Sequence, residues 1–358
     1  MQTGPDTFPS RPDPRRRFAM DRRRFLIAGA GATAAVAAGC SSSDSSESAP
    51  ASDGTDAPDT TVAGPKPAET TPADTSIPAE PLSPAAAALL PPGSPGLMDE
   101  TTYQARVDDY LAFATSVDHS SNPSGINAHL GRAHRDPDYV WDVDAVTVDS
   151  LGAVFEQIDN WEDTRDFRFM DLHWMLVLGQ GDTPMTQLSP EVIDAIDARM
   201  VANRYRYDDP LPADRVDNLW FWSENHRIIN LAIEYLAGQR YPDEAFTVTG
   251  LTGAEHLDRA RPDILEWIDE RADLGFFEWH SNVYMLKNIT PLLMLAELAD
   301  DPEIVTAAAM ALDLCLVDMA AHNHSGGYTA PRGRTYKKDK MTSLDEDTFG
   351  TAKFVFDD

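Results

Sequence analysis

A polar and aromatic cluster, Trp-Ser-Glu-Asn-His at residues 222–226, stands directly before a strongly apolar segment. Ser223 is a good helix N-cap, and Glu224 interacts favourably with the positive end of a helix dipole. Capping explains Asn225 and His226 less well, because both fall early in a segment that reads as a buried helix. With an ordinary pKa of about 6.5, His226 is a candidate general base near neutral pH. Its structural alternative is a hydrogen bond to a neighbouring hairpin.

Tryptophan accompanies this cluster and recurs further along the chain. Trp222 and Trp279 are each followed three positions later by an asparagine, Asn225 or Asn282. Because aromatic faces stack on the apolar C–H faces of pyranose rings, an exposed tryptophan here is a candidate sugar platform. Of Trp220 and Trp222, we expect one to lie in the core and the other to face a ligand.

A second group of chemically capable residues lies in the segment Gly-Gly-Tyr-Thr-Ala-Pro-Arg-Gly-Arg-Thr-Tyr-Lys-Lys, residues 326–338. Its glycines permit close approach of the backbone to a ligand. Arg332, Arg334, Lys337 and Lys338 form the main basic cluster of an otherwise acidic domain, as an anionic ligand would require. The alternative is a flexible basic surface loop.

Helical periodicity dominates the chain that must position these residues. In residues 101–117, apolar side chains recur at spacings of three and four, at Tyr103, Val107, Tyr110, Leu111 and Ala114. Residues 122–125, Asn-Pro-Ser-Gly, read as a loop. Further helices are predicted at about residues 147–159, 167–179, 189–204, 223–238, 254–271, 281–299 and 302–322. Since few segments alternate as a strand does, the predicted fold is all-α.

The predicted helices fall into a weak internal repeat. Apolar helices with aromatic starts, at residues 167–180 and after Trp222 and Trp279, alternate with amphipathic helices at a period of about 55 residues. This alternation predicts stacked helical hairpins.

The overall charge limits the partners of the domain. The 358 residues carry a formal net charge of -30, with 59 acidic against 29 basic side chains. Such a surface repels nucleic acid and anionic lipid, so we expect no nucleic-acid partner, and an acidic ligand needs a local basic pocket.

The N-terminus has the pattern of an export signal. Residues 21–26, Asp-Arg-Arg-Arg-Phe-Leu, match a twin-arginine signal, and a short apolar run ends in Ala-Ala-Gly before Cys40. This ending resembles the lipobox of bacterial lipoproteins, which predicts lipidation of Cys40 and anchoring at the outer face of the cell membrane. An uncleaved signal anchor is the alternative, and Met20 is a possible start in place of Met1.

The predicted organisation is therefore a signal at residues 1–40, a linker at 41–96 and a helical domain at 97–358. The linker is rich in Ser, Thr, Asp, Ala and Pro and buries too little apolar surface to offset its ordering entropy, so we expect a disordered tether. With Cys40 lipidated, Cys315 remains as a core residue, and no disulfide is expected within the domain.

The alternating helices, with the motifs Trp-Ser-Glu-Asn-His, Glu-Trp-His-Ser-Asn-Val-Tyr and Arg-Gly-Arg-Thr-Tyr at successive helix starts, resemble the (α/α) toroid domains of polysaccharide lyases, including the alginate lyase and heparinase-like groups. The resemblance covers roughly residues 160–340. It implies a sugar-binding groove lined by the N-terminal ends of inner helices, and cleavage of uronate-containing glycans by β-elimination without a cofactor.

The β-elimination that the resemblance implies has three chemical needs, and candidate residues of this chain supply each. Asn225 and Arg334 would neutralise the uronate carboxylate, His226 would remove the C5 proton, and Tyr336 would protonate the leaving oxygen. The remaining groove residues, expected to bind the polysaccharide or oligosaccharide, are Trp222, Glu224, Glu278, Trp279, Asn282, Tyr284 and Arg332.

The chain departs from these lyases in three ways. Glu224 stands where the lyases have asparagine, no β-sandwich domain is visible, and the hairpins are too few for a six-hairpin toroid. We therefore expect an incomplete toroid or a chain that continues beyond residue 358.

Two other functions remain open. One is a toroid-type glycoside hydrolase using Glu224 and Glu278 as its carboxylate pair, and the other is a non-catalytic glycan-binding lipoprotein. No metal site is predicted, because His280 looks isolated, and His322 and His324 read as caps at a helix end.

Overall fold

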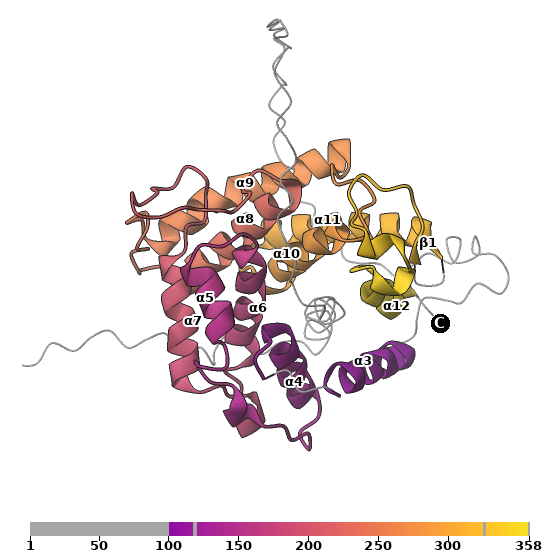
Figure 1. Cartoon of the computed structure of the whole chain (residues 1–358), viewed down its shortest axis with the longest axis horizontal. Helices are drawn as coiled ribbons and strands as arrows, with labels where there is room; N and C mark the ends of the chain where they lie inside the picture. Colours follow the sequence, from indigo (N-terminus) through magenta and orange to yellow (C-terminus); the bar gives the residue numbers. More distant parts are fainter. Residues whose placement is uncertain (1–99, 117–119, 325–326, 357–358) are drawn as a thin grey trace, which may run out of the picture. The chain divides into compact units, whose positions relative to one another are not determined.

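The computed structural model describes residues 100–116, 120–324 and 327–356 (Figure 1). The predicted signal, Cys40 and the predicted tether lie outside these residues. From Tyr103 onward, the described residues belong to one compact unit. The predicted all-α character is confirmed, since β-structure in the described residues amounts to one short antiparallel pair and two isolated bridges.

The helices run in chain order along this unit. They are α3 (Glu100–Ala114), α4 (Pro123–Arg135), α5 (Gly152–Asp159), α6 (Arg165–Leu178), α7 (Pro190–Ala202), α8 (Glu224–Arg240), α9 (Gly253–Leu274), α10 (Tyr284–Leu298), α11 (Pro302–His322) and α12 (Phe349–Phe356). Strand β1 (Asn323–His324) pairs antiparallel with β2 (Gly327–Tyr328) directly after α11.

Most of the predicted helices are confirmed, but the predicted loop at residues 122–125 is wrong. Asn122 is the N-cap of α4, where its side chain accepts a hydrogen bond of 3.2 Å from the Ser124 amide, and Pro123 occupies the first helical turn. Proline is favoured at this position because its missing N–H would have no intrahelical partner there. The Asn-Pro pair therefore marks a helix start. Helix α12 was also not predicted.

Four helices form an inner series in which each packs on the next: α4 on α6, α6 on α8, and α8 on α10. The intervening helices pack against this series. Helices α5 and α7 contact α6, α9 contacts α8, and α11 contacts both α10 and α9 (Figure 1). This order agrees with the predicted alternation of apolar and amphipathic helices.

Burial explains the difference between the two kinds of helix. Helix α8 is buried on nearly all sides from Glu224 to Gly238, whereas α9 buries one stripe that includes Ile264, Trp267 and Ile268. Cys315 on α11 is fully buried, which confirms its predicted place in the core.

Helix α3 uses the apolar face predicted from its spacing. Val107, Leu111 and Ala114 are buried, and the rings of Tyr103 and Tyr110 make edge contacts with Phe354 of α12. Contacts therefore join the first and last described helices.

Helix α11 is long and apolar enough to cross a membrane by length and composition alone, a test that a core helix of a soluble protein also passes. Its buried side, which includes Ile304, Ala308 and Cys315, packs on the core, whereas Met310 and Val317 are exposed.

Candidate functional site

Buried ionisable side chains meet where helices α6 and α8 begin. In the first turn of α6, Asp166 is 1 % exposed, and in the first turn of α8, His226 is 5 % exposed. Their side chains meet, with His226 Nδ1 2.6 Å from Asp166 Oδ2. Because an ionised carboxylate only accepts, the imidazole donates from Nδ1, and the neutral ring carries its lone pair on Nε2.

Neighbouring groups hold this dyad in place. Asn230, one turn further along α8, donates from Nδ2 to the His226 carbonyl at 2.8 Å and approaches Asp166 Oδ2 at 3.5 Å. The ring of Phe167 stacks on the imidazole, with centroids 5.2 Å apart and planes 4° from parallel. The imidazole is therefore fixed in both orientation and tautomer.

Burial and charge act on the pKa of His226 in opposite directions. Burial lowers the pKa, but the hydrogen bond and charge of Asp166, with the charges of Asp163 and Glu278, raise it further, so that it lies above the ordinary value of 6.5. The ring therefore holds its proton to higher pH than an ordinary histidine does.

Lys287 of α10 adds a cation to the same region. Its Nζ lies 4.8 Å from the centroid of the Phe167 ring, on whose face His226 also stacks. Burial lowers the pKa of Lys287, while the charges of Asp347, Asp171 and Asp166 partly oppose that shift. This lysine faces carboxylates from two segments, α6 and the chain just before α12.

Helix α4 contributes two hydrogen bonds to Asp171 of α6. Ser124 donates a hydrogen bond of 2.9 Å to Asp171 Oδ2, and Asn127 donates one of 2.9 Å to the Asp171 carbonyl. Burial raises the pKa of Asp171 to about 6, against the opposing effects of Ser124, Arg168 and Lys287. Asp171 therefore titrates close to neutral pH.

A second cluster joins the segment before α10 to the segment after β2. Arg334 Nη1 donates to Glu278 Oε1 at 2.6 Å, and its Nη2 donates to the Tyr336 hydroxyl at 2.9 Å. The guanidinium also lies 3.7 Å from the centroid of the Tyr284 ring, and the two tyrosine hydroxyls are 2.5 Å apart. The structure thus brings four of the predicted site residues into contact.

Glu278 connects the two clusters electrostatically. Burial raises its pKa, the hydrogen bond and charge of Arg334 lower it, and the net direction is upward, with Glu224 adding to the rise and His226 opposing it. One of its oxygens, Oε2, is buried without a hydrogen-bond partner. The dyad and the Arg334 cluster are neighbours, because Glu224, two residues before His226, accepts a hydrogen bond of 2.9 Å from the Glu278 amide.

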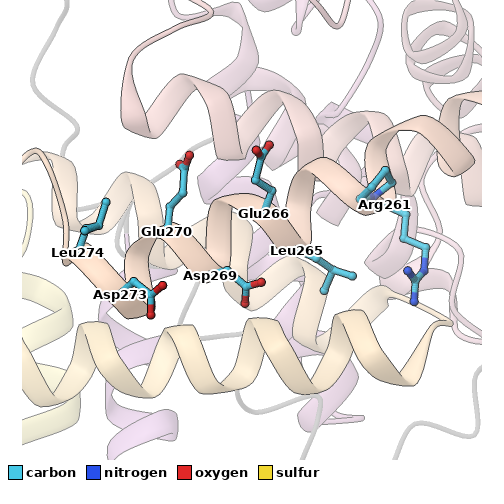
Figure 2. Close-up of a pocket in the computed structure, with 8 residues that line it drawn as sticks. Arg261, Leu265, Glu266, Asp269, Glu270, Asp273 and Leu274 are labelled. Carbon is cyan, nitrogen blue, oxygen red and sulfur yellow. The ribbon is translucent and has the colours of Figure 1, made fainter. Parts of the chain in front are cut away.

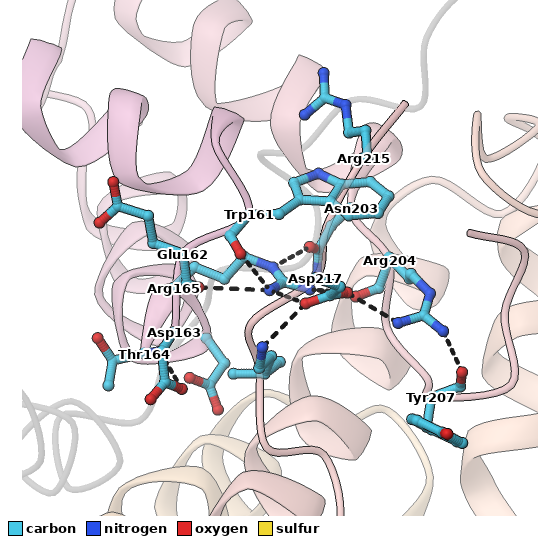
Figure 3. A network of polar contacts seen from close by, with 12 residues as sticks. Trp161, Glu162, Asp163, Thr164, Arg165, Asn203, Arg204, Tyr207, Arg215 and Asp217 are labelled. Atoms are coloured by element: carbon cyan, nitrogen blue, oxygen red, sulfur yellow. Dashed lines mark hydrogen bonds and ion pairs between the residues drawn. The ribbon is translucent and has the colours of Figure 1, made fainter. Parts of the chain in front are cut away.

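A buried ionic network fixes the start of α6 (Figure 3). Arg165 is bidentate to Asp217, with distances of 2.7 and 2.9 Å, and Arg204 donates to the same carboxylate at 2.9 Å. The turn before α6 holds Trp161 and Thr164 at positive φ, 53° and 66°, which non-glycine residues rarely adopt. The network therefore holds a strained turn next to Asp166.

Glu224 has contacts typical of a structural carboxylate. It accepts hydrogen bonds from the amides of Phe277 and Glu278 at 2.7 and 2.9 Å, and Arg271 lies 3.2 Å away. It is 6 % exposed, so its oxygens are used within the protein. The proposed carboxylate pair of a hydrolase, Glu224 and Glu278, is adjacent in space, but Glu224 instead positions the segment that carries Glu278.

The two tryptophans before α8 differ from expectation. Neither lies in the core: Trp220 is 56 % and Trp222 63 % exposed, and their rings make an edge contact with centroids 5.3 Å apart. The core positions of this turn are taken by Leu219 and Phe221 instead. With the exposed Tyr207, whose ring lies 5.7 Å from that of Trp222, they form an aromatic surface cluster.

The remaining predicted site residues divide between surface and core. Trp279 is half exposed, whereas Asn225 and Asn282 are fully buried. Asn225 accepts a hydrogen bond of 2.9 Å from Ser223, and Asn282 donates one of 3.0 Å to the Asp339 carbonyl. Both asparagines therefore use their side chains in hydrogen bonds within the protein.

The predicted basic cluster is largely neutralised by the protein itself. Arg332 pairs with the buried Glu346, and Lys338 lies 2.9 Å from Asp347. Since Arg334 pairs with Glu278, the segment does not present the concentrated positive charge that its sequence indicates. Of these arginines, Arg334 is the one whose contacts lie beside the dyad.

The His280 side chain is isolated in sequence but not in space. Its Nε2 lies 3.2 Å from Asp318 Oδ1, and His322 Nδ1 lies 3.5 Å from the same oxygen. Of the described residues, these three make up a group of histidine and carboxylate side chains close enough to hold a metal ion. The signal in the sequence was the i, i+4 spacing of Asp318 and His322 on one helix.

A separate shallow pocket lies on α9 and does not include any predicted site residue. It is lined by Arg261, Pro262, Leu265, Glu266, Asp269, Glu270, Asp273 and Leu274 (Figure 2). Five of these side chains are charged, and all of the five except Arg261 are acidic. The pocket therefore disfavours an anionic ligand.

Sequence reasoning missed Asp166 and Lys287. Asp166 precedes His226 by 60 residues, about one repeat, and both stand in the first turn of an inner helix. Lys287 is a single cation within the apolar helix α10. In both cases a charged residue in an otherwise buried helix was the available signal.

Comparisons with known protein families, with curated proteins and with solved structures find no match to this chain.

Proposed function

We propose that this chain is a polysaccharide lyase-like enzyme that cleaves uronate-containing glycans by β-elimination. The observation that carries the proposal is the buried Asp166–His226 dyad, electrostatically coupled to Glu278, which pairs with Arg334 beside two tyrosine hydroxyls. A base of suitable pKa, a cation and a hydroxyl donor are the three groups that this elimination needs.

The proton-transfer steps follow from the dyad and the tyrosine. His226 Nε2 takes the C5 proton, while Asp166 stabilises the imidazolium that forms. The electron pair of that C–H bond becomes the C4=C5 double bond, and the bond from C4 to the glycosidic oxygen breaks. Tyr336, which accepts a hydrogen bond from Arg334, gives its hydroxyl proton to the departing oxygen.

Arg334 is the proposed ligand of the uronate carboxylate. Its side chain is 40 % exposed, and its present partner Glu278 has a raised pKa, so Glu278 gives up its negative charge more readily than an ordinary glutamate. A substrate carboxylate can then replace Glu278 at the guanidinium. Lys287 adds positive charge near the dyad, which also favours an anionic substrate.

We further propose that the helical hairpins form a toroid, with the substrate bound at the N-terminal ends of the inner helices. The packing of α4, α6, α8 and α10 in series, and the contacts of α3 with α12, support this arrangement. The exposed cluster of Tyr207, Trp220 and Trp222 lies at the start of α8 and offers stacking faces for further sugar units.

The proposed location is the outer face of the cell membrane, where polysaccharide is accessible. It depends on the twin-arginine pattern and the lipobox ending at Cys40.

Incubating the purified chain with uronate polysaccharides is expected to generate ultraviolet absorbance, because the new C4=C5 double bond is conjugated with the carboxylate. Hydrolysis does not form this double bond. New reducing ends without absorbance would instead favour a hydrolase. Saturable glycan binding without either product, lost in Trp222→Ala, would favour a non-catalytic binding protein.

Replacing Arg334 by glutamine is expected to raise KM and lower kcat/KM by roughly 10- to 100-fold, the range expected for losing a charged hydrogen bond. Steady-state rates on a uronate polysaccharide measure the effect. The matched control is Arg261→Gln on α9, which removes an arginine paired with Asp301 and Glu303. Equal rates for Arg334→Gln and the wild type would contradict the proposed role of Arg334 in binding the substrate carboxylate.

A further inference from the structure

Two histidines and an aspartate converge beside the candidate site. His280 comes from the segment before α10, while Asp318 and His322 lie one turn apart near the end of α11. One ligand atom from each residue lies within 4.8 Å of the others. The two imidazole rings are tilted at 42° with centroids 4.2 Å apart, and both approach Asp318 Oδ1.

The distances from Asp318 to the two histidines match those of a metal coordination shell. Zn²⁺ binds imidazole nitrogen and carboxylate oxygen at about 2.0–2.2 Å in tetrahedral geometry, which separates neighbouring ligand atoms by roughly 3.3–3.6 Å. The distances from Asp318 Oδ1 are 3.2 Å to His280 Nε2 and 3.5 Å to His322 Nδ1. Binding through His322 Nδ1 requires only that it give up its 2.8 Å contact with the Asp318 carbonyl.

Outer groups orient two of the three side chains. The Tyr328 hydroxyl donates to Asp318 Oδ2 at 2.6 Å, which leaves Oδ1 directed at the histidines. The ring of Trp279 stacks on His280 with centroids 4.5 Å apart. Metal ligands are commonly held by such outer contacts.

The backbone at His280 is also unusual. Its φ is 47°, in the left-handed region that non-glycine residues rarely adopt. Strained residues of this kind cluster at functional sites, where the surrounding structure holds them. In this conformation the imidazole reaches α11, where its Nε2 lies 3.2 Å from Asp318 Oδ1.

We propose that His280, Asp318 and His322 bind a divalent transition-metal ion of the zinc class, with a fourth position open to water. Two imidazoles and one carboxylate suit such an ion better than Ca²⁺ or Mg²⁺, which prefer shells of oxygen. The ion would tie the segment carrying Glu278 and Trp279 to α11. This inference is independent of the proposed lyase reaction, because it requires no turnover.

The proposal is tested by titrating Zn²⁺ into the purified full-length chain carrying Cys40→Ser, which removes a competing thiol. Calorimetry is expected to find one tight site per chain. His280→Ala, Asp318→Asn and His322→Ala are each expected to weaken binding by more than about 100-fold, and Tyr328→Phe by roughly 10- to 100-fold, as for other outer-shell partners. The matched control is His324→Ala, whose exposed side chain is two residues from His322 and should leave affinity unchanged.

X-ray absorption of the zinc-loaded protein provides a measurement that needs no variant. Two imidazole ligands and an oxygen ligand are expected around the ion. A spectrum lacking imidazole, unchanged affinity in all three ligand variants, a loss in His324→Ala as large as theirs, or tighter binding of Ca²⁺ or Mg²⁺ than of Zn²⁺ would overturn the assignment.

Discussion

Asp166→Asn is expected to lower kcat for uronate cleavage by about 10⁴-fold, the effect of the equivalent change in a Ser-His-Asp triad. The asparagine amide can donate to His226 Nδ1, which favours the tautomer that carries its proton on Nε2. That tautomer has no lone pair for the C5 proton. Initial rates of ultraviolet absorbance measure the loss.

His226→Ala, which removes the base itself, is expected to lower the rate of uronate cleavage by about 10²- to 10⁴-fold in the same assay.

The pH profile distinguishes a positioning role for Asp166 from a merely structural one. The base must be neutral, so activity should rise with pH through the pKa of His226, which lies above 6.5. Because Asp166 raises that pKa, Asp166→Asn should move the acidic limb of the profile to lower pH. Asp163→Asn is the matched control, since the exposed Asp163 acts on His226 by charge alone and should move the limb less. Lower activity with an unmoved limb would contradict the assigned role.

Local sequence patterns predicted the helices because burial of an apolar face imposes the 3.6-residue period directly. Helix α11 matches its predicted bounds, residues 302–322, and the start of α8 differs by one residue from expectation. Helix α4 was missed because proline was read as a loop signal when it stood in the first helical turn. Proline alone does not distinguish a loop from a helix start, because it is common in both.

The candidate site was only partly predictable because its partnerships join residues far apart in the chain. The sequence singled out His226 and Arg334, but nothing local to them indicates Asp166 or shows that Arg334 pairs with Glu278 across 56 residues. The same limitation made His280 look isolated, although Asp318 lies 38 residues away and 3.2 Å distant in space. Ion pairs with distant carboxylates also neutralise Arg332, Arg334 and Lys338, and the amino-acid composition does not reveal such pairs.

The prediction that one of the two tryptophans lies in the core was wrong for a related reason. Trp220 and Trp222 alternate with Leu219 and Phe221 in the turn before α8, and the smaller pair fills the core. Size and hydrophobicity favour tryptophan for the interior, but alternation places only one set of side chains inward. The exposed set is then available for a ligand.

Asp217→Asn is expected to destabilise the domain by about 3–5 kcal/mol, because it leaves two arginines without their shared buried charge. The side chains of Arg165 and Asp217 are 0 % and 3 % exposed, and that of Arg204 is 6 % exposed. Chemical denaturation followed by circular dichroism measures the change. Asp159→Asn is the matched control: it breaks the exposed pair with Arg199 and should cost about 0–1 kcal/mol.

Acid should reveal the same interaction in the wild type. Burial raises the pKa of Asp217, but hydrogen bonds and charge from Arg165 and Arg204 lower it further, to below its ordinary 3.8. The stabilisation is therefore present above pH 3.8 and lost as the pH falls through the lower pKa of the folded state. Asp217→Asn should remove this part of the acid dependence, while Asp159→Asn retains it. If both variants unfold alike at every pH, the network does not hold the strained turn beside Asp166.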